Sequence, residues 1–180
     1  SVDWEEATLQ RRGYVEAIQS DEVVAAIRSG PYGKIAVAYV EWAGIYLQRT
    51  LIDWTLIDGP DSARAFTLAL AEAKIDTGPW TSISAAIHYA IPMFLSNGFQ
   101  GTRRVIDISG DGPNNTGSLV TEARDSAIAA GITVNGLPIV NDRPGPGGIR
   151  SIRDLDKYYR DCVIGGANAF MIVAQDFTDF

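Results

Sequence analysis

The chain contains only one cysteine and one histidine, and it has fewer basic than acidic side chains. The single cysteine, Cys162, excludes an intrachain disulfide and any cysteine-rich metal cluster. The 15 Lys and Arg residues against 22 Asp and Glu residues give a net charge of −7. Nucleic-acid binding requires basic side chains that neutralise phosphates. We therefore expect no nucleic-acid partner.

Long hydrophobic runs are also absent. The longest ones, residues 35–40 and 167–174, are far too short to span a bilayer. No cleavable leader stands at the start of the sequence. We therefore expect no membrane insertion. In contrast, 180 residues of which 46% are hydrophobic suffice for the core of one globular domain.

Helical and strand patterns alternate along the chain. The spacing of apolar residues predicts helices over residues 4–28, 61–74, 81–95, 119–130 and 151–163, and the start of another at 176. Apolar, β-branched runs predict strands over 34–42, 49–57, 104–109, 132–140 and 169–175, and residues 141–148 are predicted to form an exposed loop.

The connections between these elements indicate the fold class. The first two strands are separated by a short turn and are expected to pair antiparallel, whereas the later strands are separated by helices and require crossovers. The sequence therefore predicts an α/β fold with a doubly wound, mainly parallel sheet, one antiparallel edge strand and helices on both faces.

Oxygen-bearing side chains lie in the loops that should meet at the carboxyl edge of this sheet, where doubly wound proteins bind ligands. These loops are residues 1–3, 78–82 and 109–112. They offer hydroxyls and carboxylates but no His or Cys, a set that suits Mg²⁺ or Mn²⁺ rather than zinc. Ser and Thr before a helix also serve as caps, and Asp-Gly often forms a turn, so composition alone leaves both interpretations open.

Two segments resemble a known metal site. Residues 81–87 (TSISAAI) and 105–115 (VIDISGDGPNN) resemble the second and third elements of the metal-ion-dependent adhesion site of von Willebrand factor A (vWA) domains. Shorter phrases resemble a bacterial family of uncharacterised vWA-like proteins, namely AYVEW (38–42), WTLI (54–57), GDGPNN (110–115) and GLPI (136–139). The resemblance implies a vWA fold and a site, but no established activity.

The resemblance implies three metal ligands. Thr81 would ligate through its hydroxyl, directly or through water, and Asp111 through a water. Ser1 falls at the last serine of the Asp-x-Ser-x-Ser loop that follows the first strand of the family pattern. Because the sequence begins at that serine and ends where a last helix should begin, we expect a single vWA-like domain over residues 1–180 that is truncated at both ends, with its first strand missing.

The implied function is adhesion-type binding of another protein. Mg²⁺ (or Mn²⁺) would keep one coordination position open for a Glu or Asp carboxylate of the partner. No catalytic or cofactor-binding residue is assigned, because His88 has no Ser or Cys nucleophile in a recognisable motif with it. A metal-assisted hydrolase at the same edge and a metal-free structural scaffold are the alternatives. Similar proteins commonly carry secretory leaders, which implies an extracytoplasmic location, periplasmic or secreted.

Overall fold

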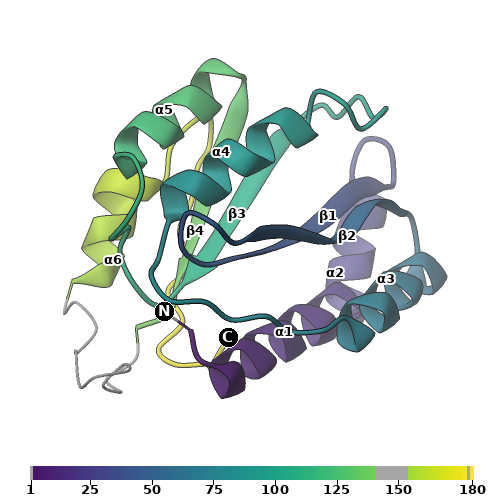
Figure 1. Cartoon of the computed structure of the whole chain (residues 1–180). Coiled ribbons are helices and arrows are strands. Elements are labelled where there is room, and N and C mark those ends of the chain that lie inside the picture. The colour runs from purple at the N-terminus through teal and green to yellow at the C-terminus, as the bar shows by residue number, and fades with distance from the viewer. Residues whose placement is uncertain (1, 141–153, 178) are drawn as a thin grey trace. The chain divides into compact units, whose positions relative to one another are not determined.

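The computed structural model describes residues 2–140, 154–177 and 179–180. Its elements are labelled in Figure 1 and are α1 (Trp4–Ile18), α2 (Asp21–Ser29), β1 (Ile35–Trp42), β2 (Gln48–Ile57), α3 (Pro60–Glu72), α4 (Ile83–Met93), β3 (Arg104–Gly110), α5 (Val120–Ala129), β4 (Ile132–Pro138), α6 (Leu155–Tyr158) and the π-helical turn η1 (Tyr159–Val163).

The chain divides into two compact units. One, called the site unit here, comprises Ser1–Asp3, Trp42–Gln48 and Thr77–Phe180. The other, called the hairpin unit, comprises Trp4–Glu41 and Arg49–Asp76. The single vWA-like domain over residues 1–180 stays a prediction.

The hairpin unit begins with two helices where the sequence predicted one long helix over residues 4–28. Helix α1 ends at Ile18, and α2 begins at Asp21. The Ser20 hydroxyl accepts a hydrogen bond from the Val23 amide at 3.2 Å and so caps a new helix. The helix predicted over residues 4–28 is therefore interrupted at Ser20.

Strands β1 and β2 form a two-stranded sheet. Only Ala43–Leu47 connect them, which is too short for a parallel crossover, so they pair antiparallel as expected. Most of both strands belongs to the hairpin unit, whose core is a cluster from α2, β2 and α3. Its members are Val24, Ile27, Ile57, Ala63, Phe66 and Leu70.

A network of charged side chains lies at the end of β1 in the hairpin unit. The Glu41 carboxylate accepts hydrogen bonds from Arg11 at 2.7 Å, Arg49 at 3.2 Å and the Asp76 amide at 3.0 Å. The Asp76 carboxylate forms ion pairs with Arg49 at 2.6 Å and Lys74 at 3.0 Å. Because the Arg11 and Glu41 side chains are nearly buried, each depends on the other for charge compensation.

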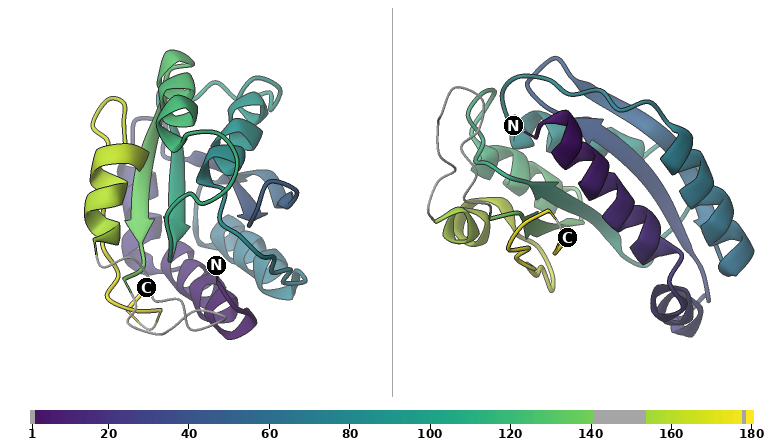
Figure 2. Two further views of the ribbon diagram at one scale, coloured as in Figure 1. Left: turned by 60° about the vertical axis from the view of Figure 1, so that its left-hand side comes forward. Right: turned by 90° about the horizontal axis from the view of Figure 1, so that it is seen from below.

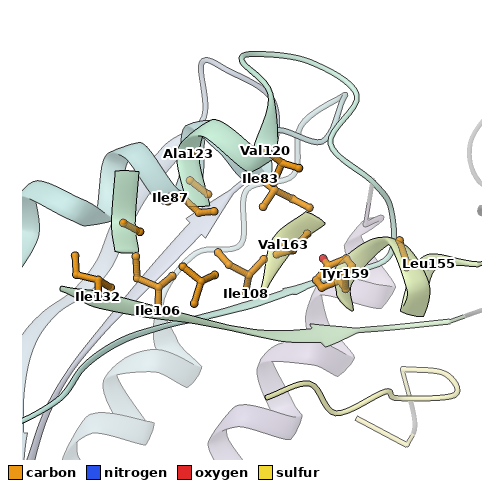
Figure 3. Close-up of a cluster of buried hydrophobic side chains, with 13 residues drawn as sticks. Ile83, Ile87, Ile106, Ile108, Val120, Ala123, Ile132, Leu155, Tyr159 and Val163 are labelled. Atoms are coloured by element: carbon orange, nitrogen blue, oxygen red, sulfur yellow. The ribbon is translucent and has the colours of Figure 1, made fainter. Parts of the chain in front are cut away.

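The site unit is built on β3 and β4, which pair in parallel from Arg104↔Ile132 to Gly110↔Pro138. Figure 2 shows the two strands side by side. Helices α4, α5 and α6 with η1 contribute to one core beside these strands, shown in Figure 3. Its members include Ile83, Ile87, Ile106, Ile108, Val120, Ala123, Ile132, Val134, Leu155, Tyr159 and Val163.

The strand predicted over residues 169–175 is replaced by two isolated parallel bridges, Gly136↔Met171 and Ile139↔Ala174. The Gly136 amide donates to the Phe170 carbonyl at 3.1 Å, and the Ala174 amide donates to the Pro138 carbonyl at 3.0 Å. In a regular parallel ladder, the hydrogen bond between these two would be donated by the backbone amide of residue 138. Pro138 has no N–H to donate. The segment therefore runs along β4 without forming a regular strand.

The last helices also differ from expectation. Helix α6 and the turn η1 occupy 155–163 of the helix predicted over 151–163, while residues 141–148 and 151–153 lie outside the described residues. The described residues beyond 175 form turns rather than the start of a helix. Side-chain carboxylates, rather than helix carbonyls, accept the hydrogen bonds of backbone amides there. The Gln175 amide donates to the Asp179 side chain, and the Asp179 amide donates to the Asp176 side chain.

An α/β fold is thus present, and part of the predicted sheet is parallel. The described residues contain two separate sheets of two strands each, β1 with β2 and β3 with β4. The single doubly wound sheet is not confirmed and stays a prediction.

Candidate functional site

Helix α4 begins at Ile83, two residues after Thr81. The Ser82 side chain is its N-cap and accepts a hydrogen bond from the Ala85 amide at 3.3 Å. The Thr81 amide donates to the Asn115 side-chain oxygen at 2.8 Å, and the Asn115 amide donates to the Thr81 carbonyl at 2.9 Å. These bonds attach the start of α4 to the loop that follows β3.

Asn114 forms the second attachment between this loop and α4. Its side-chain oxygen accepts from the Ser84 amide at 2.9 Å, and its side-chain nitrogen donates to the Ser118 carbonyl at 3.0 Å. The Asn114 amide donates to the Tyr158 hydroxyl at 3.2 Å. Burial of that hydroxyl raises the pKa of Tyr158, so it stays neutral at physiological pH.

The structure brings Thr81 beside the turn that carries Asp111. The Thr81 Oγ1 atom lies 3.7 Å from the position that a Cβ would take at Gly112, and the Thr81 side chain is only 4% exposed. Asp111 itself is half-buried. No residue in the described parts of the chain forms a hydrogen bond with Thr81 Oγ1. Ser1, the third predicted ligand, lies outside the described residues.

Ser82 and Ser84 are fully buried and have structural roles. The Ser82 hydroxyl donates to the Thr116 carbonyl at 2.9 Å and lies 3.3 Å from the Ser84 hydroxyl. Gly117 has a φ of +91°, and a Cβ there would lie 2.6 Å from Ser82 Oγ and 2.9 Å from Ser84 Oγ. Glycine is therefore required for this loop to approach the helix so closely. The cap interpretation holds for Ser82, whereas the Thr81 hydroxyl has no hydrogen-bond partner among the residues that the structure describes.

The turn between β1 and β2 packs against the same end of α4. The Ser82 amide donates to the Ala43 carbonyl at 2.7 Å, and a Cβ on Gly44 would lie 3.3 Å from the Trp80 Cβ. Trp80 has a φ of +70° and is 63% exposed, and Tyr46 in the turn is 95% exposed. Two aromatic side chains thus face solvent near Thr81.

The site is poor in the groups that bind metal most tightly. Among residues 2–140, 154–177 and 179–180 there is no group of three or more His, Cys, Asp or Glu side chains that could hold an ion. Any ion beside Thr81 would rely on hydroxyl, carboxylate and water oxygens. His88 is exposed, and its Nε2 lies 3.5 Å from Ser118 Oγ.

The assignment of Thr81 and Asp111 as metal ligands stays a prediction, and sequence reasoning missed the hydrogen bonds by which Asn114 and Asn115 hold the start of α4. These two residues follow the Gly-Asp-Gly-Pro run, where the sequence predicts part of the surface that sets partner specificity rather than a positioning role. Their position next to Asp111 in the sequence was a signal that they belong to this site. The partners of their side chains lie some 30 residues away in the chain, so the local sequence does not identify them.

Two solved structures show a similar fold. Proximal thread matrix protein 1 from the mussel byssus, with a zinc-occupied metal-ion-dependent adhesion site, is 14% identical with a TM-score of 0.63, over 98% of this chain and 40% of that chain. BatB from Bacteroides thetaiotaomicron is 19% identical with a TM-score of 0.54, over 96% of this chain and 80% of that chain. At such identities the likeness shows the fold alone.

The chain spans about two fifths of the length of the mussel protein. No curated protein matches it. Within the described residues, no helix has the length and apolar character needed to cross a membrane. Residues 1–180 match the family described as Protein of unknown function (DUF1194). The chain therefore belongs to the DUF1194 family, and its fold is von Willebrand factor A-like.

Proposed function

We propose that the protein is a binding module in which Mg²⁺ or Mn²⁺, held near Thr81 and Asp111, binds a Glu or Asp carboxylate of another protein. Thr81 carries this proposal, because the residue is only 4% exposed beside the Asp111 turn and its hydroxyl has no hydrogen-bond partner among the described residues. A bound ion or its water supplies that partner.

The donor types favour a hard cation. Hydroxyl and carboxylate oxygens completed by water suit Mg²⁺ and Mn²⁺, and neither His nor Cys stands in the loops beside Thr81. Ser1 is the third proposed ligand. The zinc in the adhesion site of the mussel protein supports a divalent ion as the ligand. With so few carboxylates, affinity for the ion alone is weak, and the partner's carboxylate adds to it.

The surface around the site favours a protein partner over a small substrate. Trp80 and Tyr46 are exposed next to the loop that carries Thr81. Exposed aromatic residues are the side chains that most often anchor protein interfaces.

The proposed location is extracytoplasmic, periplasmic or secreted. It rests on the resemblance to proteins that commonly carry secretory leaders. Cell fractionation of the native organism tests it, and recovery of the protein only with cytoplasmic markers would contradict it.

The first test is calorimetric titration of the chain with MgCl₂ and MnCl₂. Thr81→Ala and Asp111→Ala are each expected to weaken binding by about tenfold or more, since loss of a group that supports a metal site has effects of this size. Thr81→Ser retains the hydroxyl and is expected to bind as the wild type does. Thr102→Ala and Asp125→Ala are matched controls away from the site.

The second test concerns the partner. Peptides with one Asp or Glu at a fixed position and varied neighbours are selected on the immobilised protein in Mg²⁺ and eluted with EDTA. Enrichment of carboxylate peptides on the wild type but not on Thr81→Ala supports the proposal. Equal metal titrations of the wild type and a Thr81→Ala/Asp111→Ala variant would overturn it and favour a metal-free scaffold. Turnover of a phosphate or ester panel that these variants lose would favour the hydrolase.

A further inference from the structure

A long stretch of this acidic chain contains no acidic residue. Residues 77–106 have no Asp or Glu, although the chain has 22 of them and a net charge of −7. The stretch includes α4, the loop after it and the first residues of β3. Its charged residues are Arg103 and Arg104, at the end of that loop. The loop is therefore locally positive in a negative protein.

The loop after α4 also exposes large apolar side chains. Leu95 is 73% exposed and Phe99 is 38% exposed. Between them Gly98 has a φ of +74°, and the Asn97 side chain accepts a hydrogen bond from the Phe99 amide at 2.9 Å, so the backbone turns here. Figure 1 shows this loop extending past the end of α4. The turn thus presents a leucine and a phenylalanine to solvent.

Neither arginine of the loop has a carboxylate partner among the described residues. Arg103 and Arg104 form no ion pair with any residue that the structure describes. Arg49, Arg124 and Arg160 each have a carboxylate partner within 2.9 Å. The positive charge of the loop is therefore available to an external anion.

We infer that the loop over residues 94–104 docks the protein on the surface of an anionic lipid bilayer. Leu95 and Phe99 enter the boundary between headgroups and acyl chains, and the two arginines contact lipid phosphates. Interfacial binding of this kind combines buried apolar side chains with attraction of basic residues to anionic lipid. A lipid surface also accepts a projecting loop without a shaped groove, which a protein partner would have to provide. The binding is peripheral and reversible.

Docking in this way leaves the candidate metal site facing solution. Thr81 precedes α4 and Asp111 follows β3, whereas the loop lies between the end of α4 and the start of β3. The 11 residues of α4 span about 16 Å at 1.5 Å per residue. The loop and the metal site therefore lie at opposite ends of the same helix. A docked protein keeps this end of α4 free to meet a soluble partner.

The test is flotation of the whole chain with vesicles of equal parts phosphatidylglycerol and phosphatidylcholine, and with vesicles of phosphatidylcholine alone. We expect binding to the anionic vesicles that weakens as salt is raised. Arg103→Gln and Arg104→Gln are each expected to lower partitioning about fivefold. Leu95→Ser/Phe99→Ser is expected to abolish flotation. Leu119→Ser and Arg64→Gln, in exposed positions elsewhere, are expected to float as the wild type does.

All these substitutions are at the surface, and an unchanged thermal midpoint confirms that the variants fold. Equal flotation of wild type and loop variants, or no flotation of the wild type, would overturn the inference. Binding to polyglutamate but not to anionic vesicles would assign the loop to an acidic protein instead. EDTA is expected to leave flotation unchanged. The flotation result is therefore independent of whether the protein binds a partner through a metal ion.

Discussion

Thr81 and Asn115 form a reciprocal pair of hydrogen bonds, one from the Thr81 amide to the Asn115 side chain at 2.8 Å and one from the Asn115 amide to the Thr81 carbonyl at 2.9 Å. The pair joins the residue before α4 to the loop after β3. These two hydrogen bonds hold Thr81 beside the turn that carries Asp111.

Asn115→Ala is expected to lower the free energy of unfolding by about 1 kcal/mol, because one hydrogen bond to a backbone amide is lost. It is also expected to weaken Mg²⁺ binding about tenfold, since Thr81 loses one of its two hydrogen bonds to the loop. Urea unfolding and calorimetry measure the two effects. Asn97→Ala, which removes a similar bond to the Phe99 amide, is the control and should leave metal binding unchanged. Unaltered metal affinity in Asn115→Ala would contradict the positioning role.

Gly117→Ala is expected to destabilise the protein by about 2–4 kcal/mol. Its φ of +91° disfavours a side chain, and the new Cβ would collide with the Ser82 and Ser84 hydroxyls. Gly131→Ala is the matched control, because Gly131 has a φ of +74° but no atom within 4 Å of the added Cβ. Gly131→Ala should lower the free energy of unfolding by only about 1–2 kcal/mol. Equal thermal shifts for the two variants would mean that the contact with the two serines does not matter.

Asp76→Asn is expected to reduce stability at neutral pH but not in acid. The hydrogen bond from Lys74, with a further contribution from Arg49, lowers the pKa of the Asp76 carboxyl below its ordinary value. A lowered pKa contributes stability above the unfolded-state value of about 3.9, and this contribution is lost as pH falls through the folded-state pKa. Urea midpoints across pH measure the difference, which should shrink toward zero in acid.

The control for Asp76→Asn is Glu72→Gln, an exposed carboxylate of α3 that forms no ion pair with the described residues. It should change the urea midpoint little at any pH. If the difference in urea midpoint between the wild type and Asp76→Asn stays constant over the acid range, the ion pairs with Lys74 and Arg49 do not stabilise the fold.

Local patterns predicted most of the elements, and their failures have local causes. Strands β1 to β3 and helices α3 to α5 lie close to their predicted bounds, because each has an apolar face with the proper period. The long first helix failed at Ser20, whose hydroxyl caps α2. The last strand failed because Pro138, in its neighbour, has no N–H to donate. Ser20 and Pro138 can both be identified in the sequence. Their effects, however, depend on which backbone groups lie opposite them in the folded chain.

By itself, the sequence determined the alternation of helices and strands, the acidic charge, the acid-free stretch and the residue types available to bind an ion. These properties depend on composition and on neighbours a few positions apart. Only the tertiary structure decided that the Thr81 hydroxyl faces the Asp111 turn and that Asn114 and Asn115 hold it there, while Ser82 is used as a cap. The reason is physical: hydrogen bonds between residues some 30 positions apart form only after β3 and α4 have packed on a common core.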